Sequence, residues 1–506
     1  MKQIIRILSS RIFKISFLIV LQILILCTLF WFLSITSNLF IIVTNILNIV
    51  LVIYVFNSKV NPGYRILWII VILGIPYIGG ICYILFAQKK VPAALSGIQT
   101  TKLIEENLLS YDPSIAKDNT LDIHYKRQFD YIQNQSGFPI YKNTNLNYYG
   151  DINDLLKQLL IDIRSAKHFI FIEFFIICEG YMFNSILDEL LKKVREGVKV
   201  YMLYDDAGCL TTLPSDFKSK LNDLGISCLI FNKLKPRLYV HLNNRNHRKI
   251  IVVDNEIAYM GGFNLADEYI NKYKKYGEWK DCGIRLNGEA VYNCTVMFIQ
   301  FYNAISKNDK LKYNDFKFDC KISNPYYVLP FSDSPTDDEN LGFNTHLNLI
   351  NNAKKTLYIQ TPYLILDSTL LEALCRASKN NVEIIINTPH IPDKPLVLEV
   401  TRNYYKELLE ANIKIYEFTP GFLHSKVLVA DNNIALIGTI NMDYRSYFLH
   451  YECGVLINDK HTINDIVKDF NDTIALSQNI KISDIDNISL YKRVLRLGLN
   501  VVSPLL

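Results

Sequence analysis

The sequence lacks any tract rich in lysine or arginine and any segment that interleaves aromatic with basic residues. Proteins that bind nucleic acid usually show one of these features, so their absence argues against a nucleic-acid partner. The net charge of +5 is mildly basic. It is compatible with an anionic partner, although many proteins without one share it.

Cysteines with paired spacing are also missing. The seven cysteines beyond residue 180 are scattered along the chain. A disulfide framework would show a more regular pattern, so the spacing favours a reducing compartment for this part of the protein.

Charged side chains are absent from three apolar stretches near the N-terminus, at about 15–33, 39–56 and 66–86. Each reaches or approaches the roughly 20 residues that a membrane-spanning helix needs. A cleavable signal peptide is disfavoured, because the first stretch is too long and a second follows closely. Residues 1–90 are therefore predicted to form the membrane part, with two or three helices.

The orientation of these helices follows less directly. Basic residues such as Arg6 and Arg11 precede the first stretch and place the N-terminus in the cytoplasm. Three full spans would leave the rest of the chain outside, whereas Lys89 and Lys90 argue for the inside. A third stretch kinked near Pro76 could be re-entrant, which would remove the conflict. The sequence thus favours a multi-pass membrane protein with a cytoplasmic soluble part.

The pattern His-x-Lys-x4-Asp occurs twice, and the same glycine and asparagine follow each copy. Counted from the histidine, Lys stands at +2, Asp at +7, Gly at +14 and Asn at +17. The two sets are His247, Lys249, Asp254, Gly261 and Asn264, and His424, Lys426, Asp431, Gly438 and Asn441. One copy alone would often be a strand with a partly exposed histidine. Two copies with the same downstream residues predict an enzyme with a duplicated histidine site.

The residue types indicate phosphate chemistry. An apolar run follows each lysine, as in a buried strand, so that His and Lys leave the same face. The ammonium group can bind phosphate oxygens, neutral imidazole can attack phosphorus, and the asparagine amides can donate to the same oxygens. The pattern contains cations and no cluster of carboxylate ligands, so neither a metal nor another cofactor is expected.

The two motifs resemble the paired HKD motifs of the phospholipase D superfamily. Other segments resemble bacterial cardiolipin synthases specifically. They are residues 172–177, 203–208 and 441–446, the ending 495–506, and Asn61-Pro62 ahead of a Trp-containing apolar stretch. The resemblance covers nearly the whole chain. It implies a bacterial cell-membrane enzyme that transfers a phosphatidyl group between phosphatidylglycerol molecules, with a phosphohistidine intermediate.

The resemblance also assigns roles. In two-HKD relatives the N-terminal histidine is usually the nucleophile, which makes His247 the expected nucleophile and His424 the acid and base. Lys249, Lys426, Asn264 and Asn441 would stabilise charge on the phosphoryl oxygens. Asp281 and Glu452 stand where the family keeps residues that orient the histidines. Asp254 and Asp431 are expected to hold the site together rather than contact substrate. The other histidines, His450 among them, are assigned to the surface or the core, although His241 is close enough to the first motif to be considered for the site.

The soluble part is predicted to consist of two duplicated halves. After a polar connector at 91–145, the first half spans 146–324 and the second 325–506. Matching segments recur at nearly constant offsets, as with Glu173 and Gln360, which are 187 apart. Strands alternate with amphipathic helices such as 151–165 and 184–196. We expect an α/β architecture: two phospholipase D-like α/β sandwich domains that share one active-site cleft.

Two questions stay open from the sequence. Transfer and hydrolysis use the same motif, so a hydrolytic phospholipase D or a phosphatidyltransferase with another alcohol acceptor is the alternative function. The tail at 490–506 mixes leucines and cations at near-helical spacing. It is either a helix that closes the core of the second half or a segment that lies in the membrane interface. The oligomeric state is not readable from the sequence.

Overall fold

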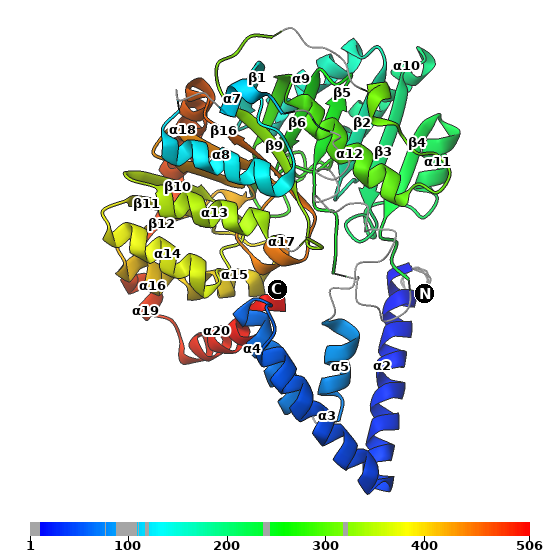
Figure 1. The fold of residues 1–506 in the computed structure, drawn as a ribbon, viewed down its shortest axis with the longest axis vertical. Coiled ribbons are helices and arrows are strands. Elements are labelled where there is room, and N and C mark those ends of the chain that lie inside the picture. Colours follow the sequence, from blue (N-terminus) through cyan, green and yellow to red (C-terminus); the bar gives the residue numbers. More distant parts are fainter. Residues whose placement is uncertain are drawn as a thin grey trace.

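Two mixed sheets organise the soluble part in the computed structural model, which describes residues 11–75, 77–87, 109, 111–116, 121–235, 243–316, 322–337 and 339–505 (Figure 1). The first sheet has seven strands in the order β1-β8-β6-β5-β2-β3-β4. Their bounds are β1 Thr144–Tyr149, β2 Phe169–Phe174, β3 Lys199–Asp205, β4 Ile226–Phe231, β5 Ile250–Val253, β6 Ile257–Gly261 and β8 Gly283–Gly288.

The second sheet repeats this topology. Read from the corresponding edge, its eight strands follow the order β9-β16-β15-β14-β10-β11-β12-β17, so that only β17 is additional. The strand directions match as well, since β2–β3 and β10–β11 are parallel while β2–β5 and β10–β14 are antiparallel. The bounds are β9 Val328–Asp333, β10 Thr356–Gln360, β11 Glu383–Pro389, β12 Lys414–Phe418, β14 Val427–Ala430, β15 Ile434–Gly438, β16 Glu452–Ile457 and β17 Ser477–Ile480. The predicted duplicated α/β architecture is confirmed.

Helices pack on the sheets and join the two halves. Helix α12 contacts strand β9 of the second half, and α18 contacts strand β1 of the first half. A short parallel pair of strands, β7 and β13, also crosses between the halves. The bounds are α9 Ile152–Ser165, α10 Tyr181–Arg195, α11 Phe217–Asp223, β7 Glu278–Lys280, α12 Val291–Ile305, the 3-10 helix Tyr313–Phe316, α13 Leu341–Asn352, α14 Ser368–Lys379, α15 Pro395–Asn403, α16 Tyr405–Glu410, β13 Gly421–Leu423, α17 Tyr444–Phe448 and α18 Lys460–Ala475.

The predicted connector contains a helix that belongs to the second half. Helix α8 (Ile123–Ser136), which follows the short α7 (Pro113–Ala116), packs against α13 and β9. The hydroxyl group of Tyr125 donates to Asp431, and the ring of Phe129 lies 5.7 Å from that of Tyr327. The second half therefore uses residues that precede the first half in the sequence. Strand β9, which follows the predicted boundary at 325, pairs with strand β16 of the second half, and its residue Val328 also forms an isolated bridge with Tyr141. The position of the boundary stays a prediction.

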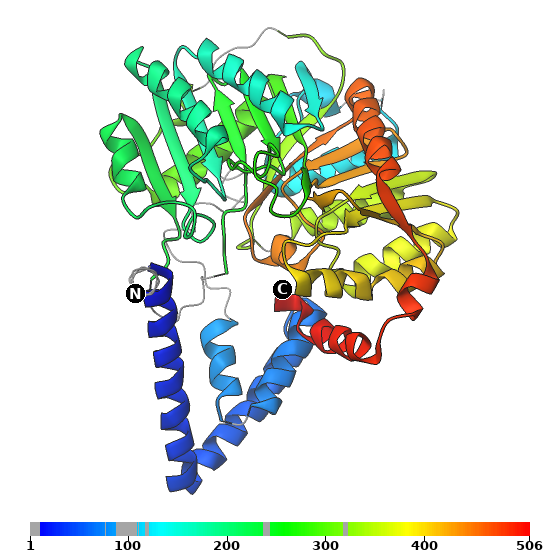
Figure 2. The ribbon, with the colours of Figure 1, turned by 180° about the vertical axis from the view of Figure 1, so that it is seen from behind.

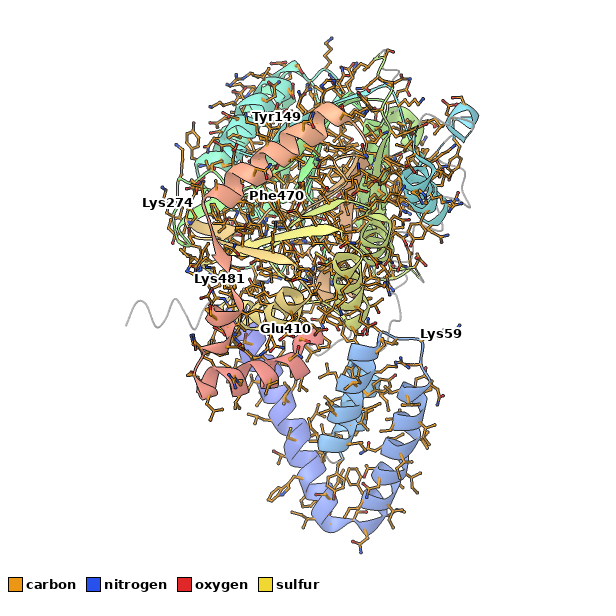
Figure 3. The ribbon with its side chains drawn as sticks, turned by 90° about the vertical axis from the view of Figure 1, so that its left-hand side faces the viewer. Lys59, Tyr149, Lys274, Glu410, Phe470 and Lys481 are labelled. Carbon is orange, nitrogen blue, oxygen red and sulfur yellow. The ribbon has the colours of Figure 1, made fainter. Side chains whose placement is uncertain are left out.

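Two N-terminal helices extend away from the soluble part (Figures 1 and 2). They are α2 (Arg11–Thr36) and α3 (Asn38–Phe56), and within the described residues they alone are both long and apolar enough to cross a membrane. Their side chains are almost entirely carbon, and Lys59 lies at the end nearest the soluble part (Figure 3). The Arg11 guanidinium, at the start of α2, donates to Asp206 of the first half at 2.8 Å.

The third predicted stretch forms two shorter helices, α4 (Pro62–Gly74) and α5 (Gly79–Phe86). The chain reverses between them, with Tyr77 at a φ of 67°. A Cβ on Gly79 would lie 2.2 Å from the carbonyl oxygen of Val71, and one on Gly80 would lie 2.3 Å from the Asn48 side chain. These glycines let α5 pack closely against α4 and α3. Helix α5 thus returns toward the soluble part, as a re-entrant segment would.

Candidate active site

His247 precedes strand β5 and is held by residues of the second half. Its backbone N–H donates to the carbonyl oxygen of Tyr451 at 2.9 Å. Its Nδ1 lies 2.9 and 3.0 Å from the two carboxylate oxygens of Glu452, which is completely buried. The hydroxyl groups of Thr439 and Ser446 also donate to this carboxylate. Glu452 is thereby fixed from several directions, the geometry expected of a group that orients a histidine.

His424 follows strand β13 and is held in the same way by the first half. Its backbone N–H donates to the carbonyl oxygen of Lys280 at 2.7 Å, and its Nδ1 lies 2.7 Å from Asp281 Oδ2. Asp281 is buried and accepts from the N–H of Cys282 at 2.8 Å. Each half therefore supplies the carboxylate that holds the motif histidine of the other half.

The carboxylates fix the tautomer of both rings. Glu452 and Asp281 accept from Nδ1–H, which leaves a lone pair on Nε2 for attack on an electrophile. Burial lowers the pKa of His247 to about 3 and that of His424 to about 4, and outweighs the attraction of the carboxylates. Burial raises the pKa of each carboxyl group, but the hydrogen bonds from the adjacent histidine and the charges of nearby groups outweigh burial, so that the pKa of both carboxyl groups is lowered. The imidazole rings are therefore neutral in the empty site.

Lys249 and Lys426 are buried beside the histidines. The Lys249 ammonium donates to the carbonyl oxygen of His247 at 2.6 Å, and Lys426 donates in the same manner to that of His424. Burial lowers the pKa of Lys249 to about 7 and that of Lys426 to about 8, while the buried carboxylates oppose the shift. Below these values the site holds two positive charges, which suits a phosphate group.

The two motif asparagines differ in their contacts. Asn264 is already engaged, since its Oδ1 accepts from the N–H of Ile176 at 3.0 Å and its Nδ2 donates to the Tyr269 hydroxyl at 2.6 Å. Asn441 is buried, and within the described residues its Oδ1 has no hydrogen-bond partner. The free atom of Asn441 is thus an acceptor, and the phosphate-binding role of both residues stays a prediction.

The motif aspartates act on the backbone. Asp254 accepts from three consecutive N–H groups, those of residues 167, 168 and 169, at 2.5 to 2.8 Å. Asp431 accepts from the N–H groups of residues 354, 355 and 356 at 2.6 to 2.9 Å. Each aspartate anchors the start of the strand beside its motif, β2 or β10. Their role in the reaction stays a prediction.

Two rings that the sequence did not indicate flank the histidines. His450, which was expected outside the site, has its ring centroid 5.5 Å from that of His247. Trp279 lies in the same relation to His424, at 5.3 Å. The ring nitrogens of both are buried and lack hydrogen-bond partners among the described residues, and His450 Nδ1 is 3.7 Å from Glu452. Aligning residues 279–283 with 450–454, which share a carboxylate followed by Cys-Gly, would have found them.

Other sequence candidates lie elsewhere. The Glu173 carboxylate is buried in an ion pair with Arg248 at 2.7 Å, a structural role. His346 Nδ1 contacts the carbonyl oxygen of Gly342, and His390 pairs with Glu417. His241 lies outside the described residues. The side chains of His247, His450 and Glu452 lie close enough together to hold a metal ion. The contact between His247 and Glu452 is, however, that of a hydrogen-bonded histidine–carboxylate pair. The absence of a metal stays a prediction.

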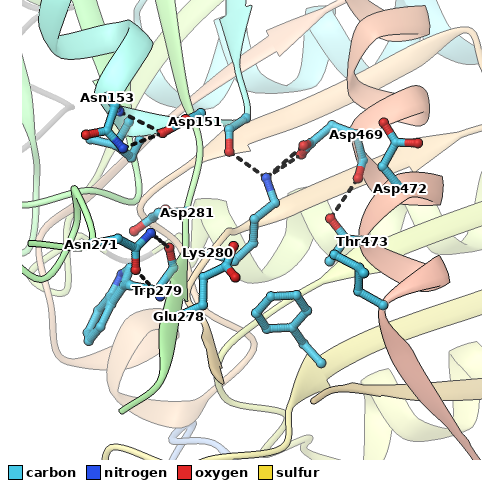
Figure 4. A pocket seen from close by; sticks show the side chains of 14 residues that line it. Asp151, Asn153, Asn271, Glu278, Trp279, Lys280, Asp281, Asp469, Asp472 and Thr473 are labelled. Carbon is cyan, nitrogen blue, oxygen red and sulfur yellow. Dashed lines mark hydrogen bonds and ion pairs between the residues drawn. The ribbon is translucent and has the colours of Figure 1, made fainter. Parts of the chain in front are cut away.

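A cavity lies on another side of Asp281, between the two halves (Figure 4). Its volume is about 390 Å³, and its lining does not include either motif histidine. Acidic side chains predominate there, and the Lys280 ammonium is held between the Gly150 carbonyl oxygen and Asp469. An anionic headgroup would be repelled by this lining, so we do not assign the cavity to the substrate.

Comparison with known proteins decides the family. The family described as cardiolipin synthase, PLD-like domain, matches residues 159–275 and 346–474, and the phospholipase D-nuclease N-terminal family matches 46–88. Cardiolipin synthase of Staphylococcus aureus is 32% identical over 82% of this chain and 85% of its own. Cardiolipin synthase 2 of Staphylococcus epidermidis is 31% identical over 88% and 93%. The chain belongs to the cardiolipin synthase family.

The fold agrees with this family assignment. Phosphatidylserine synthase of Haemophilus influenzae superposes with a TM-score of 0.58, at 16% identity, over 76% of this chain and all of that one. As a member of the cardiolipin synthase family, the protein is a phosphatidyltransferase that is associated with membranes and acts on phospholipid. The two HKD histidines therefore lie in an enzyme whose chemistry takes place at phosphorus.

The lysine pKa values predict a loss of activity at alkaline pH. Because burial lowers them to about 7 and about 8, both ammonium groups lose their protons as the pH rises through this range. We expect kcat/KM for the phospholipid substrate to fall over the same range, since kcat/KM follows the ionisation of the free enzyme. Lys249→Arg, which keeps its charge, should move the fall to higher pH. An unchanged kcat/KM up to pH ~9 would contradict this role of the lysines.

Proposed function

We propose that the protein transfers the phosphatidyl group of one phosphatidylglycerol to a second, which yields cardiolipin and glycerol. The reciprocal pairing of His247 with Glu452 and of His424 with Asp281 carries the proposal. It provides two oriented, neutral imidazoles of which one can attack phosphorus while the other handles protons. The names of the relatives supply the product, and the resemblance of the sequence to that family supplies the donor.

The reaction has two steps, and each takes place at the same pair of histidines. Nε2 of His247 attacks phosphorus, the bond from phosphorus to the glycerol oxygen breaks, and His424 gives its proton to that oxygen. The charge of the bound phosphodiester raises the pKa of His424 above its value in the empty site, so that the ring can hold this proton. His424 then removes the proton of the incoming hydroxyl group, which attacks phosphorus and releases His247. Lys249 and Lys426 stabilise the charge on the phosphoryl oxygens.

The assignment of His247 as nucleophile has its own support. Glu452, its partner, receives two hydroxyl hydrogen bonds in addition to that of the ring, whereas Asp281 receives one from the backbone. The hydrogen bonds that Glu452 already accepts reduce its ability to stabilise a protonated ring, so His247 is the less readily protonated of the two histidines. A ring that stays neutral is the one suited to form the covalent bond.

Single histidine variants should separate the two roles. Each of His247→Ala and His424→Ala should lower the turnover rate by about a thousandfold or more. With a radiolabelled donor that carries an activated leaving group, His424→Ala should still accumulate acid-labile label on the protein, because that step needs no acid. His247→Ala should not. Label retained by His247→Ala and lost from His424→Ala would reverse the assignment.

Transfer is favoured over hydrolysis by the burial of the site. His247 and His424 are each only 7% exposed, which limits the access of water to the phosphohistidine. Purified enzyme given phosphatidylglycerol alone should produce cardiolipin and glycerol in equal amounts, measured by mass spectrometry. The variant with both histidines replaced by alanine is the control for contaminating activity. Phosphatidic acid as the main product would instead identify a hydrolytic phospholipase D.

We further infer a membrane topology. The start of α2, residues 57–61 between α3 and α4, and the end of α5 all lie on the side of the soluble part (Figures 1 and 2). Arg11, Lys14, Lys59 and Arg65 are on this side, whereas the turn between α2 and α3 has no charge. Positive residues favour the cytoplasm, so the proposal places the active site there, with α2 and α3 crossing the membrane and α4–α5 re-entrant.

Thiol labelling tests this topology. An impermeant maleimide should label Ser37→Cys, at the far turn, in intact cells. The half-buried Cys178 of the soluble part provides the internal comparison, since it should react only after the cells are opened. Labelling of Cys178 in intact cells, with Ser37→Cys protected, would place the catalytic halves outside.

A further inference from the structure

The C-terminal helix α20 (Leu490–Val501) has two different faces, only one of which packs on the protein. On the inner face, Arg496 is buried and its Nε donates to Glu399 of α15 at 2.8 Å. Leu499 packs against the core of the second half, and the Tyr404 hydroxyl donates to Asn500 at 3.3 Å. The inner face is therefore fixed mainly by polar contacts.

The outer face of α20 is an apolar stripe. Leu490, Val494, Leu497 and Val501, spaced by four, three and four residues, lie on one side of the helix. Their exposed fractions are 75%, 60%, 61% and 49%. A helix that closes a core would turn these side chains inward, so the core-closing alternative for the tail does not hold for them. Exposure of a continuous apolar stripe indicates a partner.

The position of α20 identifies the partner. Helix α20 lies beneath the second half, beside the membrane-facing helices α3 and α4 (Figures 1 and 2). The 3-10 helix Ser503–Leu505 that follows it contacts α4 and α17, and the Arg445 guanidinium donates to the carbonyl oxygen of Leu505 at 2.9 Å. The stripe is thus continuous with the part of the chain that enters the membrane.

Charge completes the surface. Lys492 and Arg493 are exposed, and α20 contains no acidic residue. We propose that α20 lies in the membrane interface, with Leu490, Val494, Leu497 and Val501 among the acyl chains and the cations against anionic phospholipid headgroups. This inference rests on the proposed insertion of α2 and α3 in the same membrane. It gives the second half a contact with the lipid surface in addition to α4.

Photo-crosslinking tests the contact without relying on activity. The enzyme, with p-benzoylphenylalanine in place of Leu497, is reconstituted in vesicles of phosphatidylcholine and tritiated phosphatidylglycerol and then irradiated. We expect tritium on the protein. The matched control carries the same group at Ile161, which is 54% exposed on α9, far from α2 (Figure 1), and should remain unlabelled. Crosslinked dimers at 497 would identify a second copy as the occupant, and no adduct would leave the stripe in water; either result overturns the proposal.

Activity measurements then test its consequence. The triple variant Leu490→Ser, Val494→Ser and Leu497→Ser should lower the rate on phosphatidylglycerol vesicles by about tenfold. It should leave the rate on short-chain, monomeric phosphatidylglycerol nearly unchanged, and the melting temperature as well. The control variant Ile161→Ser should leave the rates on both substrates nearly unchanged. Equal losses on both substrates with a lower melting temperature would show a structural role and overturn the proposal. If no variant or wild-type sample makes cardiolipin, the proposed function fails while the crosslinking result stands.

Discussion

The hydrogen bond between a histidine of one half and a carboxylate of the other is the interaction on which the rest of the structure depends. His247 needs Glu452, and His424 needs Asp281. Neither motif histidine takes its carboxylate partner from its own half. Each half therefore depends on the other for its site. The two halves must be joined in one relative orientation before either imidazole is oriented. The strand pair β7–β13 and the backbone contact between His247 and Tyr451 fix that orientation at the site itself.

Burial has opposite consequences for the histidines and the lysines of the site. It favours neutral imidazole, which is the nucleophilic form, but it also disfavours the ammonium ions that bind phosphate. The buried carboxylates and the backbone carbonyl oxygens of the histidines counteract the second effect by stabilising the lysines. An anionic phospholipid adds negative charge to the same place and favours both the ammonium groups and a protonated acid. The site is thus arranged for a ligand whose negative charge stabilises the ammonium groups and the protonated histidine.

Much of the fold and site could be predicted from the sequence, because the residues of each motif lie close together in the chain and their types indicate phosphate chemistry. The spacing of His, Lys and Asp predicted the site, and the repeated offsets predicted two halves with matching sheets. The partners of the histidines depend on contacts between residues far apart in sequence, so Asp281 and Glu452 were accessible only by resemblance. His450 and Trp279 were missed because they differ in residue type, and only the alignment of 279–283 with 450–454 places them in the same position. Helix α8 was read as a connector, since its attachment to the second half depends on tertiary contacts such as that of Phe129.

A short series of contacts connects helix α4 with the carboxylate that orients His247. The ring of Tyr64, in α4, packs against Tyr444 and Phe448 of α17, with centroids 5.7 and 5.9 Å away. The same short helix carries Ser446, whose hydroxyl group donates to Glu452. Helix α17 is also contacted by the 3-10 helix at the C-terminus. The carboxylate that orients His247 is therefore supported by a helix fixed between α4 and the tail. The hydrogen bond that orients His247 therefore lies close to the N-terminal apolar segments, which we propose to enter the membrane.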